Sequence, residues 1–348
     1  MLKFLARRWF LLFVLFGLIL VSQFPDTATT LLSPFSTRYL AAATLFVMSL
    51  TLRTDRLWNA VRHPGPAFVA FGITYLIAPL LGWLTAETLV SDNYRVGLIL
   101  VCTLPCTMAS ASIWTRMAGG NDAVALTVTV FTNSLVFLFT AGWLSILTGT
   151  EVEIDTFGMA RQLVLVVVIP IILGQIVRLS KGVADLVDMQ RKRLGIISQC
   201  FILILIFKSG TIAHEGLTEV EGQSVFSWAF LSVGVVCIGL HLLLLATGFQ
   251  IGRRLFSRPD AIAVAIAGSQ KTLPVGVYLL NEYYAASAHF GIVPLLVWHI
   301  GQLVVDTYIA ERFYYLAPKE PEPTPSTGAS PASASDEPRD KIPSENER

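Results

Sequence analysis

The chain has 348 residues, of which 54% are hydrophobic and 14% are charged, with a net charge of +1 and a mean hydropathy of +0.64. Soluble domains carry about 25% charged residues, so the composition excludes an ordinary soluble protein and predicts an integral membrane protein. The basic residues lie in short loops between apolar segments, which gives no support for nucleic acid as a partner.

Ten apolar segments are each long enough to cross a bilayer as a helix. In chain order they cover residues 9–24, 36–52, 66–85, 95–117, 122–147, 157–178, 194–213, 224–250, 261–283 and 288–312. The sequence therefore predicts an all-α protein with ten transmembrane helices in a lipid bilayer. We expect residues 1–316 to form this ten-span domain. Residues 317–348, rich in Pro, Ser, Glu and Ala, are expected to be a disordered cytoplasmic tail.

The first segment follows three basic residues, as in a signal peptide, but no small-residue cleavage site precedes Ser22. We expect a retained first span, with a cleaved signal peptide as the alternative. Arginine and lysine gather in the loops on one side of the ten spans, and most acidic residues lie on the other. The positive-inside rule then places both termini in the cytoplasm. The expected location is the plasma membrane, which would be the inner membrane of a bacterium.

The ninth segment carries a lysine near its middle. Counted at about 1.5 Å per helical residue from Asp260, Lys271 lies roughly 16 Å deep, near the centre of a hydrocarbon layer about 30 Å thick. A charge there costs about 2.5 to 3.5 kcal/mol on insertion scales and normally faces a partner or a wet cavity. Because Gly268 and Pro274 flank it, we expect a broken helix that lines a cavity. A buried ion pair with Asp306 of the tenth segment is the structural alternative.

The fourth segment is interrupted in the same way, by Pro105 and a run of small and hydroxylated residues. It is the fourth of the first five segments, and the ninth segment is likewise the fourth of the second five. Because five is odd, the two halves would be inverted repeats, whose paired interruptions mark a transport site. Close helix packing, with Pro105 only a kink, is the alternative. The candidate binding residues at the two breaks are Thr107, Ser110, Ser112, Ser269, Gln270, Lys271 and Thr272.

Further polar residues extend this candidate site. Two glycines precede Asn121 and Asp122, and one of these two residues is expected to cap the fifth segment, a mainly structural role. Thr129 and Asn133 share a helix face, where they would either join helices or coordinate an ion. His299 and Gln302 share a face of the tenth segment and could line the core, whereas His241 of the eighth is expected to be a packing histidine.

Four stretches carry a family resemblance: residues 50–53 with 58–61, residues 118–121 after the first break, residues 170–176, and the second break itself. In their order and spacing, over residues 8–315, the chain resembles the bile acid:sodium symporter family. Within it, the chain is similar to the divergent branch typified by solute carrier family 10 member 7. The resemblance implies two inverted five-helix repeats in which the broken helices four and nine cross. It also implies a panel-like domain of spans 1, 2, 6 and 7 and a core domain of spans 3, 4, 5, 8, 9 and 10.

The resemblance also implies ligands. An organic anion would sit between core and panel, and a sodium ion near the crossing, at Ser112, Thr129 and Gln270. Thr74 stands where better-known members have a glutamine. Ile266 stands where sodium-coupled members have an acidic residue. Lys271 could itself fill the space of a bound cation and take up a proton when the anion binds, so proton-coupled, sodium-coupled and uncoupled transport all remain open.

The expected function is secondary active transport of a small organic anion by alternating access, coupled to protons or sodium. No cofactor is expected apart from a sodium ion, and the oligomeric state is open. A non-transporting membrane regulator that keeps the transporter fold is the alternative. An enzyme is not expected, because His299 and Asp306, the candidate catalytic pair, would lie about 10 Å apart along one helix.

Overall fold

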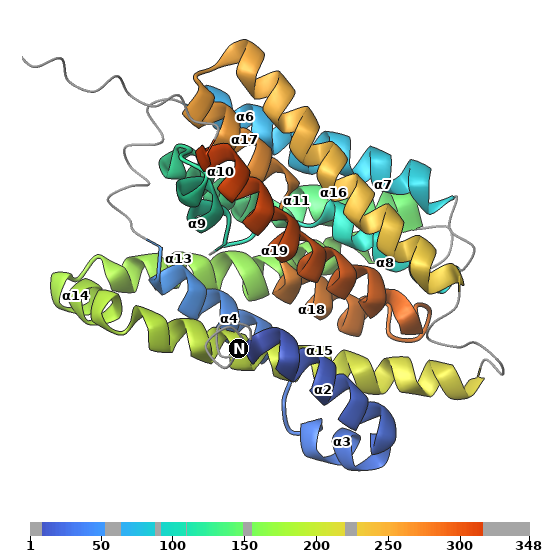
Figure 1. Cartoon of the computed structure of the whole chain (residues 1–348). Helices are drawn as coiled ribbons and strands as arrows, with labels where there is room; N and C mark the ends of the chain where they lie inside the picture. Colours follow the sequence, from blue (N-terminus) through green and yellow to red (C-terminus); the bar gives the residue numbers. More distant parts are fainter. Residues whose placement is uncertain are drawn as a thin grey trace, which may run out of the picture. The chain divides into compact units, whose positions relative to one another are not determined.

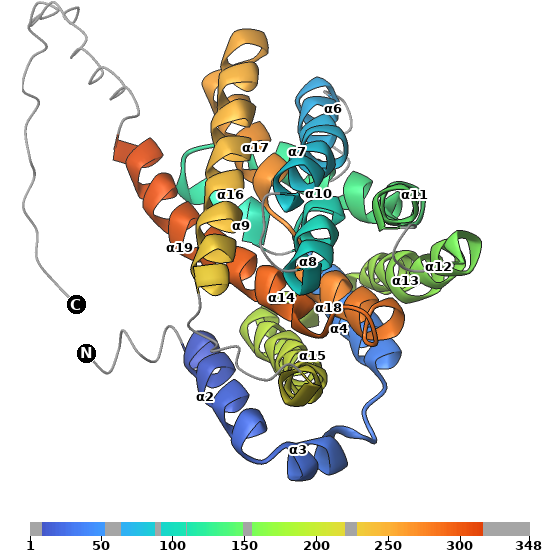
Figure 2. The same ribbon diagram turned by 90° about the vertical axis from the view of Figure 1, so that its right-hand side faces the viewer.

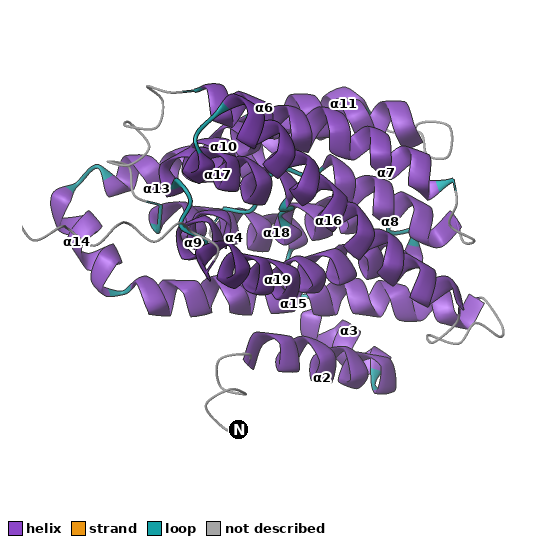
Figure 3. Ribbon diagram, turned by 45° about the horizontal axis from the view of Figure 1, so that its top comes forward, coloured by secondary structure: helices purple, strands orange, loops and turns teal. Residues whose placement is uncertain are grey.

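The computed structural model describes residues 9–52, 64–87, 92–108, 110–148, 155–219 and 228–315. The expected tail at 317–348 and the motif at 58–61 lie outside these ranges. Within them all regular secondary structure is helical, which confirms the expected all-α class (Figure 3).

The first half of the chain begins with helices near the N-terminus and continues to the end of the expected fifth span (Figure 1). Its elements are α2 (Trp9–Gln23), α3 (Pro25–Leu32), α4 (Thr37–Leu50), α6 (Gly65–Gly72), the π-helix η1 (Ile73–Ile77), α7 (Ala78–Ala86), α8 (Asp92–Thr103), α9 (Ser110–Met117), α10 (Asp122–Ser134) and α11 (Val136–Thr148).

The second half contains the longest helices. Its elements are α12 (Thr156–Leu163), the π-helix η2 (Val164–Val168), α13 (Ile169–Arg178), α14 (Lys181–Met189), α15 (Arg191–Glu219), α16 (Trp228–Leu255), α17 (Arg258–Ser269), α18 (Leu273–Tyr283), the short 3-10 helix η3 (His289–Gly291) and α19 (Ile292–Tyr315).

Six helical stretches among the described residues are long and apolar enough to cross a membrane, and two bent helix pairs raise that number to eight. The bent pairs are α2 with α3, at 113°, and α10 with α11, at 61°. Two shorter apolar helices, Thr37–Leu50 and Tyr94–Thr103, lie where the second span and the start of the fourth are expected. The helices fit a multi-pass membrane protein, and the number of ten spans stays a prediction.

Proline explains where two of the helices stop and start. Helix α8 ends at Thr103, two residues before Pro105, because proline has no N–H for the helix ladder and disfavours helical geometry in the residue before it. Helix α17 ends at Ser269, and α18 begins at Leu273 with Pro274 in its first turn, where a missing N–H costs nothing. The two non-helical stretches touch, since the Thr272 N–H donates to the Pro105 carbonyl at 3.0 Å.

Two other prolines follow π-helices that the sequence did not indicate. Pro79 comes two residues after η1 and Pro170 two residues after η2. In η1 the Ala78 N–H donates to the carbonyl of Ile73, five residues back. Pro79 offers no N–H to the next carbonyls, so they are open to partners from other elements. The carbonyl of Tyr75, for example, accepts from the indole N–H of Trp143 at 2.6 Å.

The helices pack in two sets. In the first, which we call the α15 set, α4 packs against α13 and α15, and α2 packs against α15. The second contains α6, α7, α8, α10, α16, α17 and α19, in which α16 lies along α17 and α19 (Figure 2). Close approach of α16 and α17 depends on small residues, because a Cβ on Gly248 would lie 2.8 Å from the Cα of Ala265.

Candidate functional site

The carbonyl groups freed by the first break are bound by partners from elsewhere in the chain. The carbonyls of Thr103, Cys106 and Thr107 accept hydrogen bonds, at 2.7, 2.9 and 3.0 Å, from the side chains of Thr140, Asn133 and Thr129 in turn. All six residues are buried. Thr129 and Asn133 therefore join α10 to the break, which is one of the two roles expected for them. Such pairing is required at this depth, because an unbonded backbone group in hydrocarbon costs several kcal/mol.

Lys271 binds three further carbonyls. Its ammonium nitrogen donates to the carbonyl oxygens of Thr74 and Cys102 at 2.9 Å and to that of Leu104 at 3.0 Å. The side chain is 1% exposed. The expected alternative, an ion pair between Lys271 and Asp306, is wrong. The lysine points toward α8 and η1, whereas Asp306 bonds to His241 and Gln270.

One side chain bonds both backbone groups of Lys271 in the second break. Gln302 of α19 accepts from the Lys271 N–H at 2.9 Å and donates to the Lys271 carbonyl at 3.0 Å. Its amide nitrogen also lies 3.1 Å from Nδ1 of His299. A glutamine amide thus replaces the neighbouring helical turn as hydrogen-bonding partner for the non-helical residue.

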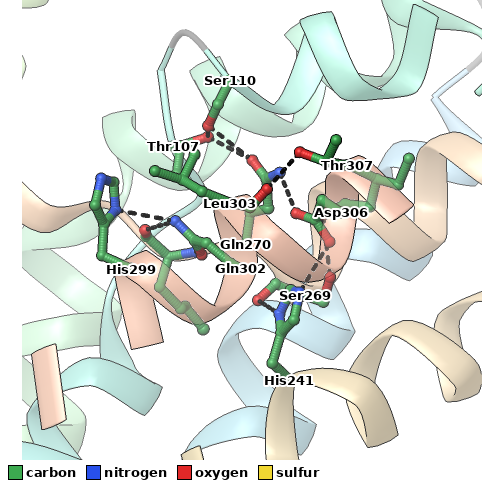
Figure 4. A network of polar contacts seen from close by, with 12 residues as sticks. Thr107, Ser110, His241, Ser269, Gln270, His299, Gln302, Leu303, Asp306 and Thr307 are labelled. Atoms are coloured by element: carbon green, nitrogen blue, oxygen red, sulfur yellow. Dashed lines mark hydrogen bonds and ion pairs between the residues drawn. The ribbon is translucent and has the colours of Figure 1, made fainter. Parts of the chain in front are cut away.

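Gln270 is the junction of a polar network that links three helices (Figure 4). Its oxygen Oε1 accepts from the hydroxyls of Thr107, at 2.7 Å, and Ser110, at 3.0 Å. Its amide nitrogen donates to Oδ2 of Asp306 at 2.5 Å. The orientation of the amide follows from these partners, since the carboxylate accepts and the hydroxyls donate. Gln270 therefore connects the first break to the middle of α19.

The network ends in a buried acid and base. Oδ1 of Asp306 lies 2.9 Å from Nε2 of His241, whose Nδ1 lies 3.3 Å from the carbonyl of Ser269 (Figure 4). Asp306 and His241 are 0% and 1% exposed. His241 is a buried, hydrogen-bonded histidine as expected, but its pairing with Asp306 was missed. The signal available was the presence of two ionisable residues in apolar spans, which seldom occur there without a partner.

A cavity of about 150 Å³ lies beside this network. From the two breaks and α19 it is lined by Thr107, Ser110, Thr272, Leu273, Pro274, His299 and Leu303, and from the α15 set by Phe10, Met48, Gln199 and Ile202. The first residues of α9 and α18 are among these lining residues, and a helix N-terminus favours negative charge. The Thr272 side chain makes no capping hydrogen bond to α18. The cavity thus combines the Thr272 hydroxyl with the positive ends of two helices.

Nine of the thirteen candidate residues lie outside this cavity lining, among them Ser112, Asn121, Thr74 and Ser269. Ser112 lines a separate pocket with Asp188, Arg191 and Lys192, and among the described residues it makes no hydrogen bond with Thr129 or Gln270. Ligands of one cation need no hydrogen bonds between them, so the sodium site implied at Ser112, Thr129 and Gln270 stays a prediction.

Asn121 caps α10, as expected, by accepting from the Ala123 N–H at 3.2 Å, and its amide donates to Asp260. The Thr74 hydroxyl donates to the Gly268 carbonyl at 3.2 Å, and the Ser269 hydroxyl donates to the Ile266 carbonyl, also at 3.2 Å. These contacts hold the backbone near the second break.

Comparison with known proteins places the chain among membrane transporters. The family model of the SBF-like CPA transporter family matches residues 8–314. The chain is 25% identical to sodium/bile acid cotransporter 7-B of Xenopus laevis over 318 residues, which cover 88% of this chain and 91% of that protein. It is 30% identical to the probable sodium/metabolite cotransporter BASS4, chloroplastic, of Arabidopsis thaliana over 299 residues, 81% of this chain and 67% of that protein. The match over nearly the whole described chain confirms the resemblance to the bile acid:sodium symporters, and the chain belongs to the SBF-like CPA transporter family.

Proposed function

We propose that the chain is a secondary active transporter of a small organic anion, coupled to a proton or sodium gradient. The observation that carries the proposal is the cavity beside the contact between the two non-helical stretches. It brings together four residues expected from the sequence to bind substrate: Thr107, Ser110, Thr272 and His299. The relatives named as cotransporters of sodium with bile acid or metabolites support a small organic substrate.

The cavity favours an anion because it is lined by the Thr272 hydroxyl and by the N-termini of α9 and α18, whereas the Thr107 and Ser110 hydroxyls already donate to Gln270. Each N-terminus adds about 0.3 to 1 kcal/mol for a negative charge in an exposed setting, and more where the site is partly buried. The lining also includes apolar side chains from α2, α4 and α15, such as Phe10 and Met48. Such a site suits a molecule with a charged group and an apolar body.

The size and position of the cavity support alternating access. Its volume of about 150 Å³ is below the roughly 300 to 1,000 Å³ of ordinary ligand pockets. We infer that substrate enters when the α15 set separates from the helices that carry the breaks, and the small cavity between them supports this inference. The two sets correspond to the panel-like and core domains of two inverted five-span repeats. Ten spans would put both termini in the cytoplasm, where protease added outside intact cells should leave terminal tags uncut.

Uptake by purified protein in liposomes tests the proposal. Proton and sodium gradients are imposed separately while a panel of radiolabelled organic anions is offered. At least one gradient should drive accumulation of at least one anion above that in protein-free liposomes. If no anion accumulates under either gradient, coupled transport is refuted, and a regulator that keeps the fold becomes the better account.

Variants of the cavity hydroxyls connect the transport to this site. Thr107→Val and Ser110→Ala each remove a donor to Gln270, so we expect uptake to fall about tenfold or more, the effect of roughly 1.4 kcal/mol. Thr127→Val is the matched control, because the Thr127 hydroxyl donates only to the Ala123 carbonyl of its own helix. Equal uptake by all three variants would exclude the cavity as the transport site.

A further inference from the structure

The amino group of Lys271 has surroundings that resemble those of a bound metal cation. Its three hydrogen-bond acceptors are backbone carbonyl oxygens, at 2.9, 2.9 and 3.0 Å, and none belongs to a carboxylate. An ammonium has three N–H donors, so these carbonyls satisfy it completely. Rings of carbonyl dipoles are also how membrane proteins replace the hydration shell of a monovalent cation.

Each carbonyl is available for a separate local reason. The carbonyl of Thr74 would bond to residue 78 in an α-helix or 79 in a π-helix, but the Ala78 N–H donates to Ile73 and Pro79 has no N–H. The carbonyl of Cys102 belongs to the last turn of α8, and Leu104 lies beyond its end. Open carbonyls at broken helices are the groups with which transporters bind cations.

We propose that the Lys271 amino group is a tethered cation that fills a monovalent-cation site formed by the carbonyls of Thr74, Cys102 and Leu104. Removal of the side chain leaves this site open to a free monovalent cation. That the lysine amino group occupies this site does not depend on the proposed transport function. One consequence does rest on it: a transporter with a lysine at this site needs no free cation there to hold the two breaks together.

A purely mechanical role for the lysine predicts something different. If the side chain only joins η1 to α8, its loss destabilises the protein by the same amount in every salt. If the carbonyls form a cation site, ions of suitable size restore the stability lost. Ammonium is the direct probe because it presents the same N–H donors as the lysine head group, and potassium and sodium test for size.

The experiment measures the thermal midpoint Tm of the purified full-length protein in detergent. Wild type and Lys271→Ala are compared in ammonium, potassium, sodium and choline chloride at one ionic strength. Lys271→Ala should have a lower Tm in choline, and at least one small cation should raise it along a saturating curve. At ten times the dissociation constant we expect a rise of about 2 °C. Wild type should show no such difference between salts.

Two controls define the site. Lys271→Met refills the space of the side chain without a charge, so it should be destabilised and should not respond to the cations. Lys208→Ala removes a half-buried lysine that also donates to two carbonyls, those of Leu32 and Phe35, but with access to water. This variant should show the same Tm in all four salts.

Two results would overturn the inference. In the first, Lys271→Ala has the same Tm, below that of wild type, in all four salts. In the second, the cations raise the Tm of Lys271→Met as much as that of Lys271→Ala. If Lys271→Ala does not yield folded protein in any of the four salts, the Tm of Lys271→Gln is measured instead, because the glutamine amide offers two uncharged donors. A Lys271→Gln variant as stable as wild type would show that the charge is not needed. Liposome uptake is a separate readout, so a failed rescue with intact uptake refutes this inference alone.

Discussion

The two hydrogen bonds between the Gln302 side chain and the Lys271 backbone allow a quantitative prediction. Gln302→Leu keeps the approximate volume but removes the acceptor of one hydrogen bond, at 2.9 Å, and the donor of another, at 3.0 Å. Both backbone groups are buried and lie in a non-helical stretch, so no helical neighbour can replace the amide. An unsatisfied buried group costs about 1 to 3 kcal/mol. Polar contacts measured in membranes average about 0.6 kcal/mol each, which sets a lower limit near 1 kcal/mol for two.

We expect a loss of about 2 to 4 kcal/mol, at least about 30-fold in the ratio of folded to unfolded protein. The assay is reversible unfolding of the purified protein in mixed micelles as the denaturing detergent is increased. Gln199→Leu is the matched control, because Gln199 lies in the membrane-length helix α15, is half-buried and makes no side-chain hydrogen bond to the described residues. If the two variants differ by less than about 0.5 kcal/mol, the backbone of the break does not depend on Gln302 and the reasoning is wrong.

Three further predictions use the same unfolding assay. Asp306→Ala leaves His241 and Gln270 buried without their carboxylate partner and should lower the free energy of unfolding by about 3 to 5 kcal/mol. Asp306→Asn keeps an acceptor and should lower it by less. Equal losses of unfolding free energy for the two variants would contradict this reasoning. Thr140→Val removes the donor to the Thr103 carbonyl and should cost about 1 to 2 kcal/mol, against less than about 0.5 kcal/mol for Thr44→Val, whose hydroxyl bonds only within its own helix. Gly97→Ala would place a Cβ 2.8 Å from the Gly291 Cα and should lower stability by more than about 1 kcal/mol. Gly142→Ala, where a Cβ meets no atom within 4 Å, should leave stability unchanged or raise it. A neutral Gly97→Ala would show that the two backbones can move apart.

The sequence indicated the candidate site because residue types report on where helices break. Proline near residue 105 and proline with glycine around Lys271 indicated two interruptions, and helices α8 and α17 do end there. The polarity of Thr107, Ser110 and Gln270 indicated a shared site, and these residues do bond to one another. Local chemistry was sufficient for both inferences.

The partners of the charged groups could not be predicted in the same way. Lys271 binds backbone carbonyls, which every residue has and which therefore leave no signal in the sequence. The pairing of Asp306 with His241 depends on how α16 and α19 are rotated against each other, and a helical pattern does not fix that rotation. The π-helix η1 was missed because Pro79 by itself is compatible with a kink or a helix start as well.

The hydrogen bonds of the first break also set an order for biogenesis. The carbonyls of Cys106 and Thr107 find their side-chain donors within 27 residues along the chain. The carbonyls of Cys102 and Leu104 accept hydrogen bonds only from Lys271 among the described residues, and this lysine lies 169 residues after Cys102 and 167 after Leu104. A nascent chain that ends before Lys271 therefore lacks the donor for these two buried carbonyls. Synthesis of the ninth expected segment supplies this donor, and we expect a chain truncated before that segment to be degraded faster than the full-length chain.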